Sequence, residues 1–533
     1  MSTLAERLLV AAAWNAVLAL VATGAAAPDV PAPVRMAAAG LLVLVLPGMA
    51  FLGAFRRALD PPRLALAVVG LSCLVMGTGL LATAMGPQDP SRLRLLGVVA
   101  ALGSAALLVL GPPRRPAPGS PWLLLGATAA AGFALASAAA LHLFPPFPDT
   151  EREVRGTAWG LAATGRPWLP GEHARPLVLG HPLMLHALVA ESLLVTGEIG
   201  VTQSTYTSAR AASAARAAGV PVDQEEVRRA DHATFLSQPA LLPTRAVSAM
   251  LFAGTLALLC ELCRRLTGSR TAGLTAAALF ALSPATLLHA GSAGHGAAAA
   301  FAMLATALLT EAPLGRRPEL GWIAAGAALG AVLDQGTAVL ALGAAALAAV
   351  RAGVAAARAP AARLRTAREA FEGRAVALLG GFLGGTALWW GYGLWVDAAG
   401  FAEEHLRAPA LGGGPSIAAA WAALSAATGH GVLPVGLAAL AVWAVARGAS
   451  EPRRTLAGWG LLAALAGALP GALPAVVAAA VALAWTGDPR RPRTGEPLRA
   501  VPRPVAWTAA GLLLISLVFE GAAVLRLVQD FRP

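Results

Sequence analysis

Long apolar runs separated by short polar loops dominate the chain of 533 residues. Windows of about 20 mostly apolar residues recur along it, and this is the length that a helix needs to cross the hydrocarbon core of a bilayer. A transmembrane barrel would instead show short segments of alternating hydrophobicity. We therefore predict an all-α polytopic membrane protein with about 13 to 15 transmembrane helices. The expected spans are residues 5–27, 34–54, 63–86, 93–111, 121–143, 242–263, 272–290, 293–311, 321–333, 335–350, 375–397, 431–446, 455–469, 471–486 and 504–526.

The first apolar run and two later pairs of runs each allow a second interpretation. Residues 5–27 are similar to a signal peptide, but the run is long and further spans follow directly, so we expect a retained first helix. Residues 321–350 and 455–486 could each form one long tilted helix instead of two spans. Gly336 and Pro470 favour the broken forms.

Basic residues gather in particular loops. The 40 basic residues other than histidine are all arginine, and the formal net charge is +12. Arginines cluster after the second, fourth, sixth and eighth spans, within residues 351–374, and before the last span. The positive-inside rule then places the N-terminus in the cytoplasm and the long loop 144–241 outside. We expect a multi-pass protein of the cell membrane. We attribute the excess of positive charge to these loops, and we expect no nucleic-acid partner.

The start of loop 144–241 contains the candidate chemistry. It follows the end of an apolar segment at Leu143, and it brings five charged residues together within seven positions. They are Asp149, Glu151, Arg152, Glu153 and Arg155. Charges so close to hydrocarbon are costly unless they lie at the interface or in a wet cavity, so they indicate a functional site. Because they follow a helix end, the pattern favours chemistry at the outer membrane surface over a pump.

The remaining loops complete the expected organisation. Residues 182–195 are apolar but short, and a crossing there would invert the next span, so we expect an interfacial helix. Residues 198–240 are polar and indicate a solvated helix or a flap. We divide the chain into three parts: an N-terminal four-helix membrane module at 1–111, a transmembrane core at 121–400 that includes loop 144–241, and C-terminal helices at 401–533 with a second external loop at 398–430.

Short motifs follow one another from residue 121 onward. The first three are Asp149-Thr150-Glu151, Gly165-Arg166-Pro167-Trp168 and His181-Pro182-Leu183. Thr244-Arg245 opens the next span and Arg264-Arg265 closes it, and Ala281-Leu282-Ser283-Pro284 and Leu333-Asp334-Gln335-Gly336 follow. In order and spacing, over about 121–400, these motifs resemble the GT-C superfamily of membrane glycosyltransferases. The closest likeness is to its protein O-mannosyltransferase and aminoarabinose-transferase-like branch.

The resemblance implies transfer of a sugar from a polyprenyl-phosphate-linked donor to a glycan, lipid or protein acceptor on the outer face. A carboxylate takes the proton of the acceptor hydroxyl as it attacks the anomeric carbon, and cations stabilise the departing lipid phosphate. Attack opposite the leaving group inverts the anomeric centre. The resemblance makes Asp149 the preferred base and Glu151 the second choice. Asp149 also suits a helix N-cap for residues 150–163, and Glu151 suits an exposed first-turn position.

The expected substrate contacts are cations and polar residues from several segments. Arg152 and Arg155 lie three residues apart on one helical face and could grip a phosphate, or they could extend to the interface instead. The resemblance adds His181, His289, His295 and Asp334 as binding residues. The alternative for His181 and Asp334 is a helix cap, and for the two other histidines an ordinary satisfied polar position.

No metal signature occurs in the sequence, and we expect no metal and no cofactor beyond the lipid-linked sugar donor as substrate. The three cysteines lie in or beside apolar runs and indicate small buried residues, not a disulfide frame. Two other functions stay open. The family's lysines are replaced by His181 and by Asp334-Gln335, which is compatible with a non-catalytic scaffold. A lipid or solute transporter would need ionisable groups at mid-bilayer, whereas acids such as Glu191 and Glu261 are expected near segment ends or in the interfacial helix.

Overall fold

The computed structural model describes most of the first 402 residues. It covers residues 3–52, 59–84, 91–111, 121–143, 154–162 except 156 and 159, 182–198, 241–267, 270–292 except 283, 295–310, 319–333 and 361–402, with three isolated helical positions at 518, 522 and 525. Every element in these ranges is a helix. The predicted all-α class is therefore confirmed for the part of the chain that the structure describes. The expected spans at 335–350 and between 431 and 486 lie outside it, as does most of 504–526.

Five of the described helical stretches are long and apolar enough to cross a membrane, as a multi-pass membrane protein requires. They are Leu4–Ala26, Ala32–Ala50, Trp122–Leu141, Thr244–Arg265 and Glu372–Trp395. Each agrees to within a few residues with a span expected from the sequence. The helices that contain them are α1 (Leu4–Ala26), α2 with η1 and α3 (Ala32–Gly40, Leu41–Val45 and Leu46–Leu52), α6 with η2 (Trp122–Ala138 and Ala139–Leu143), α11 (Leu241–Thr267) and α17 (Ala361–Ala402).

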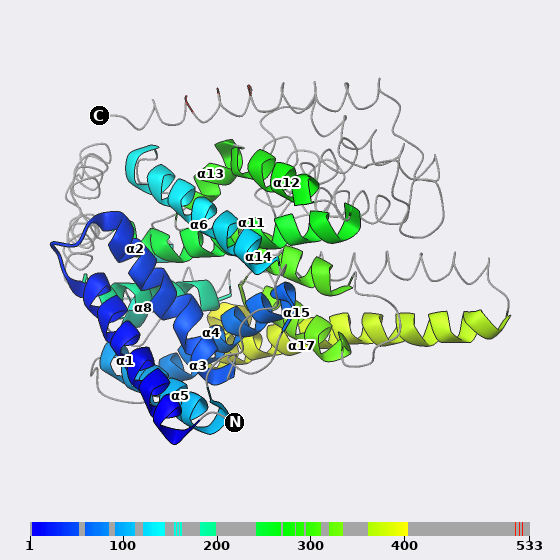
Figure 1. Ribbon diagram of the computed structural model, residues 1–533. Helices are drawn as coiled ribbons and strands as arrows, with labels where there is room; N and C mark the ends of the chain where they lie inside the picture. The colour runs from blue at the N-terminus through cyan, green and yellow to red at the C-terminus, as the bar shows by residue number, and fades with distance from the viewer. Residues whose placement is uncertain are drawn as a thin grey trace, which may run out of the picture.

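Helix α11 occupies the middle of the described bundle (Figure 1). It packs against α2, against α6, and against the shorter helices that follow it in sequence. The other described helices are α4 (Pro61–Ala84), α5 (Ser91–Leu110), α8 (Met184–Thr196), α12 (Arg270–Leu282), α13 (Pro284–Gly291), α14 (His295–Thr310) and α15 (Glu319–Leu333). One hydrophobic core runs through this bundle from Ala11 on α1 to Leu378 on α17. The three cysteines are buried.

Two helices differ from the expected spans for reasons visible in the sequence. The span expected at 272–290 is interrupted, because α12 ends at Leu282 and α13 begins at Pro284. Proline lacks the N–H that a continuous helix would need there, but it is tolerated at a helix start. Helix α17 begins at Ala361 instead of near residue 375. Its first two turns consist mostly of Ala and Arg, which favour helix even outside hydrocarbon.

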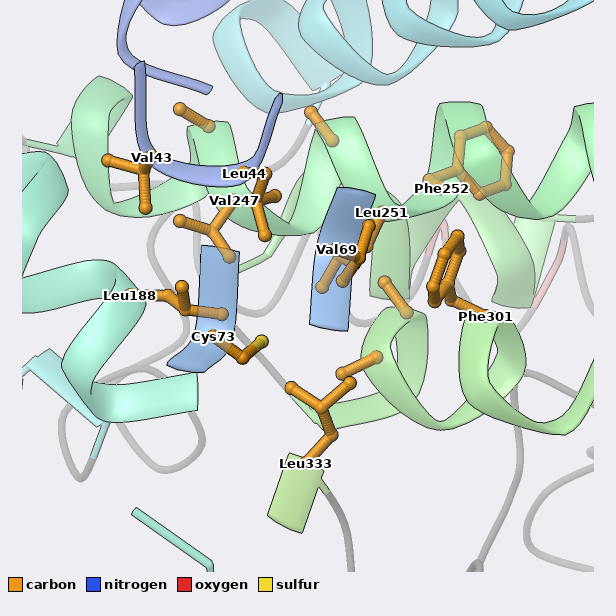
Figure 2. Close-up of a cluster of buried hydrophobic side chains, with 14 of the residues drawn as sticks. Val43, Leu44, Val69, Cys73, Leu188, Val247, Leu251, Phe252, Phe301 and Leu333 are labelled. Carbon is orange, nitrogen blue, oxygen red and sulfur yellow. The ribbon is translucent and has the colours of Figure 1, made fainter. Parts of the chain in front are cut away.

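Helix α8 lies inside the bundle. The sequence predicts an interfacial helix at 182–195, with one polar face in water. Instead, all residues of α8 except Met184 and Leu194 are buried, and Leu188 packs beside Cys73 of α4 and near Val247 of α11 (Figure 2). The expected interfacial position is therefore wrong for this helix. A helix that is apolar around its whole circumference gains most by burial on every side.

Small residues allow α15 and α17 to approach closely. A side chain at Gly381 of α17 would collide with the backbone of Ala324 on α15, and a Cβ at Gly385 would lie 2.5 Å from the carbonyl oxygen of Ala328. Gly381 and Gly385, like Ala324 and Ala328, are four residues apart. This is the small-xxx-small spacing that lets helix backbones pack directly in membranes.

Candidate functional site

The structure describes the side chain of one of the eight residues that the sequence singles out. Arg155 is buried, with 2% of its surface exposed. Asp149, Glu151, Arg152, His181 and Asp334 lie outside the described residues. For His289 and His295 only the helical position is described: His289 lies in α13, and His295 begins α14. The burial of Arg155 contradicts the alternative that its side chain extends to the interface.

Arg155 belongs to a buried group of three charged side chains, which we call the Arg155 cluster: Arg155, Glu198 and Arg35. Nη2 of Arg35 lies 2.6 Å from Oε1 of Glu198, and these two side chains are only 11% and 8% exposed. The guanidinium charge of Arg155 also acts on the Glu198 carboxylate. Burial raises the pKa of Glu198, and the charges of Arg35 and Arg155 oppose that rise. Two guanidinium groups thus act on the one carboxylate of Glu198.

A helix ending places Glu198 in this cluster. Helix α8 ends where Gly197 adopts the left-handed conformation, with φ of 73°. The N–H of Gly197 donates to the carbonyl of Leu194, and the N–H of Glu198 donates to that of Leu193, both at 3.2 Å. This pair of bonds is the Schellman motif, which glycine favours because it has no Cβ. The Thr-Gly-Glu sequence therefore directs the carboxylate of Glu198 back toward the bundle.

Arg35 reaches the cluster from the first turn of α2. Pro31 stands before this helix, and its carbonyl accepts a bond from the Arg35 N–H at 3.1 Å. The side chain of Arg35 also donates from Nε to the carbonyl of Ala25 at 3.3 Å. Ala25 lies in the last turn of α1, where carbonyl groups have no partner within the helix. One guanidinium thus joins the end of α1 to the end of α8.

A third buried arginine lies at the end of the span that precedes the acidic motif in sequence. Arg245 is 1% exposed, and its Nη1 donates to the carbonyl of Ala140 at 2.6 Å. Ala140 belongs to η2, a π-helical turn that ends at Leu143, directly before the segment with Asp149. Such turns occur frequently at functional sites. Arg245 therefore ties the start of α11 to the point at which the chain leaves α6.

Helix α8 carries two further ionisable groups into the bundle. His186 is fully buried, and Glu191 is almost so. Both belong to a helix that packs against α4 and α11. Sequence reasoning had assigned Glu191 to an interfacial helix, so it missed this burial.

Sequence reasoning also missed Arg35, Glu198 and Arg245 as site members. Arginine within the first turn of an apolar span is costly, and this signal marks both Arg35 and Arg245. The Gly-Glu pair after a short apolar run marks Glu198, because such a glycine commonly ends a helix. Among the described residues no group of His, Cys, Asp or Glu could hold a metal ion.

In comparisons with protein families, with curated proteins and with solved structures, the chain matches none. The resemblance to membrane glycosyltransferases thus rests on the sequence motifs alone. The geometry of the Arg155 cluster provides separate support for an anion site. It places two guanidinium groups in a region of low exposure, where attraction to an anion is stronger than in water.

Proposed function

We propose that the chain is an integral-membrane glycosyltransferase that moves a sugar from a polyprenyl-phosphate donor to an acceptor by inverting displacement. The observation that carries this proposal is the burial of Arg155, close enough to Glu198 for its charge to act on that carboxylate. Arg155 follows Asp149 by six residues, so a leaving-group cation and the candidate base belong to one segment. A departing lipid phosphate needs such a cation, and a cation stabilises its charge more effectively away from bulk water.

The roles divide between two kinds of side chain. Asp149 accepts the proton of the acceptor hydroxyl, and Glu151 is its alternate. Arg155 stabilises the departing phosphate together with Arg152, because guanidinium groups match phosphate oxygens in pairs. The Glu198 carboxylate, which pairs with Arg35, attracts the Arg155 guanidinium. Arg245 supports the segment by binding the carbonyl of Ala140 where that segment starts.

Transfer from labelled polyprenyl-phosphate sugars tests this proposal with the full chain in liposomes. We expect Asp149→Asn to lower the rate about 10²- to 10⁴-fold, as loss of a general base does. We expect Arg155→Gln to lower it roughly 10²-fold and Arg155→Lys to retain an intermediate rate, because lysine keeps the charge but not the paired geometry. Arg7→Gln serves as the control. Arg7 binds the carbonyls of Leu108 and Val109 at the far end of α5, so its loss should leave transfer unchanged.

Two results would contradict the proposal. Full transfer by Asp149→Asn would remove Asp149 as the base. No transfer by the native chain with any donor would favour the scaffold function instead. Unfolding measured on each variant separates loss of chemistry from loss of structure.

A transporter is the second candidate, and the buried pair of His186 and Glu191 on α8 favours it. Ionisable groups inside a helix bundle are what proton-coupled carriers use. In proteoliposomes a carrier would move protons down an imposed pH gradient together with a solute, and His186→Gln would abolish that flux. Absence of any proton flux in the native chain would exclude this function.

A further inference from the structure

An ion network joins α11 to α4 far from the Arg155 cluster. Glu261 is buried, with 1% of its side chain exposed, and it accepts bonds from Arg264 at 2.7 and 2.8 Å and from Arg265 at 2.6 Å. Arg265 also donates to Asp60 at 2.9 Å, and Arg63 lies 3.4 Å from the same carboxylate. Asp60 immediately precedes α4. Along α11, Glu261 lies about 24 Å from Arg245.

The described residues of this network carry more positive than negative charge, and they lie at the end of an apolar span. Among the described residues the network contains three guanidinium groups and two carboxylates. Arg264 and Arg265 keep 29% and 32% of their side chains exposed, although Glu261 fixes their orientation. They end the apolar span Thr244–Arg265, which is the depth at which lipid head groups lie. Their guanidinium groups therefore lie at the level of the lipid head groups.

Helix α12 adds a fourth arginine at the same end. It begins at Arg270, three residues after α11 ends. A Cβ at Gly273 would lie 2.5 Å from the carbonyl oxygen of Cys260, so the two helices touch one turn before Arg264 and one turn after Arg270. Arg270 therefore lies on the side of this contact that also holds the ion network. It is exposed, and it adds one more positive charge.

An exposed apolar stripe extends from Arg270 along α12. Leu274, Ala278 and Leu282 are exposed and follow Arg270 at intervals of four residues. They form one helical face. The opposite face is buried on α11, where Phe280 stacks on Phe252 with ring centroids 5.7 Å apart. The outward face is thus apolar as well, which suits contact with an acyl chain. Arg270 and the apolar stripe therefore lie in line along α12, in the same order as the head group and the acyl chain of a lipid.

We infer that this surface binds an anionic membrane phospholipid. The head-group phosphate pairs with Arg270 and with the exposed edges of Arg264 and Arg265, and one acyl chain lies along the stripe of Leu274, Ala278 and Leu282. Guanidinium groups that project from helix ends at head-group depth recognise such lipids. This lipid site is separate from the proposed transfer site. The inference therefore does not depend on which reaction the chain catalyses.

Photolabelling with lipid probes tests this inference. The full chain is reconstituted in phosphatidylcholine vesicles that contain a trace of phosphatidylglycerol with a diazirine in one acyl chain, or of phosphatidylcholine labelled in the same way. Peptide mapping then measures labelling at Leu274, Ala278 and Leu282. We expect the anionic probe to label α12 at least about fivefold more than the zwitterionic one. Arg270→Gln should reduce this labelling about fivefold, which is the effect of one arginine near an anionic lipid.

Arg7→Gln is the matched control. It removes one arginine of α1, outside the cluster formed by α4, α11 and α12, and it should leave the labelling of α12 unchanged. Arg270 is exposed, so its replacement should not alter thermal unfolding, and a change in labelling then reports binding. Equal labelling of α12 by both probes would overturn the inference. So would labelling that Arg270→Gln leaves at the native level, or that Arg7→Gln reduces equally.

Discussion

Replacing Arg35 by glutamine should destabilise the protein in a way that depends on pH. Arg35 and Glu198 are 11% and 8% exposed, and their charged atoms are 2.6 Å apart. Removing one partner of a buried ion pair costs about 3 kcal/mol at the lower end of measured values, because the other charge stays buried. Loss of Arg35 should therefore raise the pKa of Glu198 further, because the guanidinium no longer opposes the effect of burial.

The sign of the pH dependence follows from this rise. The pKa of Glu198 in the native fold is already raised above its ordinary value of 4.5, because burial disfavours the charged carboxylate. An acid whose folded pKa exceeds its unfolded pKa stabilises the fold below the unfolded value, and this contribution is lost as the pH rises through the folded value. Arg35→Gln should thus cost little near pH 4.5. Its cost should grow to about 3 kcal/mol above the raised pKa.

Unfolding in mixed micelles, measured from pH 4.5 to 8, would test this reasoning. The variant Arg35→Gln/Glu198→Gln has no carboxylate to titrate, so it should lose the added pH dependence. Arg7→Gln is the control, because the guanidinium of Arg7 binds carbonyl groups and its loss should have an effect that is independent of pH. A cost of Arg35→Gln that is equal at pH 4.5 and pH 8 would refute the argument, as would a double variant that keeps the pH dependence.

Three further substitutions test the packing and the helix ends by the same unfolding assay. Gly197→Ala should cost about 1 kcal/mol, because alanine is strained in the left-handed conformation that ends α8; an unchanged stability would show that this turn is not constrained. Glu261→Gln should lower the free energy of unfolding by roughly 2 kcal/mol, because its bonds to two arginines become weaker. Since Glu261 is buried, salt should not screen these bonds, and an equal loss of stability in the native chain at high salt would contradict this explanation. Gly381→Leu should separate α15 from α17 and cost more than about 2 kcal/mol. Gly384→Leu, with open space around it, should be nearly neutral, and equal effects of the two would reject the close packing.

The candidate site was only partly predictable from the sequence. Arg155 stood out because it lies among charges beside an apolar span, and the structure buries it. Glu198 did not stand out, because the Gly-Glu pair indicates the end of a helix but not which residues that end contacts. Its contact with Arg35 joins positions 163 residues apart, and local pattern contains no information about such a pair. Arg245 was noticed only as the opening residue of a span, although its side chain joins α11 to η2 through the carbonyl of Ala140.

Hydrophobic pattern alone determined the helical class and the positions of the long spans, because an apolar run of sufficient length has few stable alternatives to a helix in hydrocarbon. It did not locate the break before Pro284, because the apolar pattern runs on from 272 to 290 although proline removes a backbone donor there. Only the tertiary structure decided that α8 lies inside the bundle and that Arg35, Arg155 and Glu198 meet. An apolar helix of 13 residues satisfies the same pattern at an interface or in a core, and the choice depends on which neighbours, distant in the chain, provide a surface to bury it.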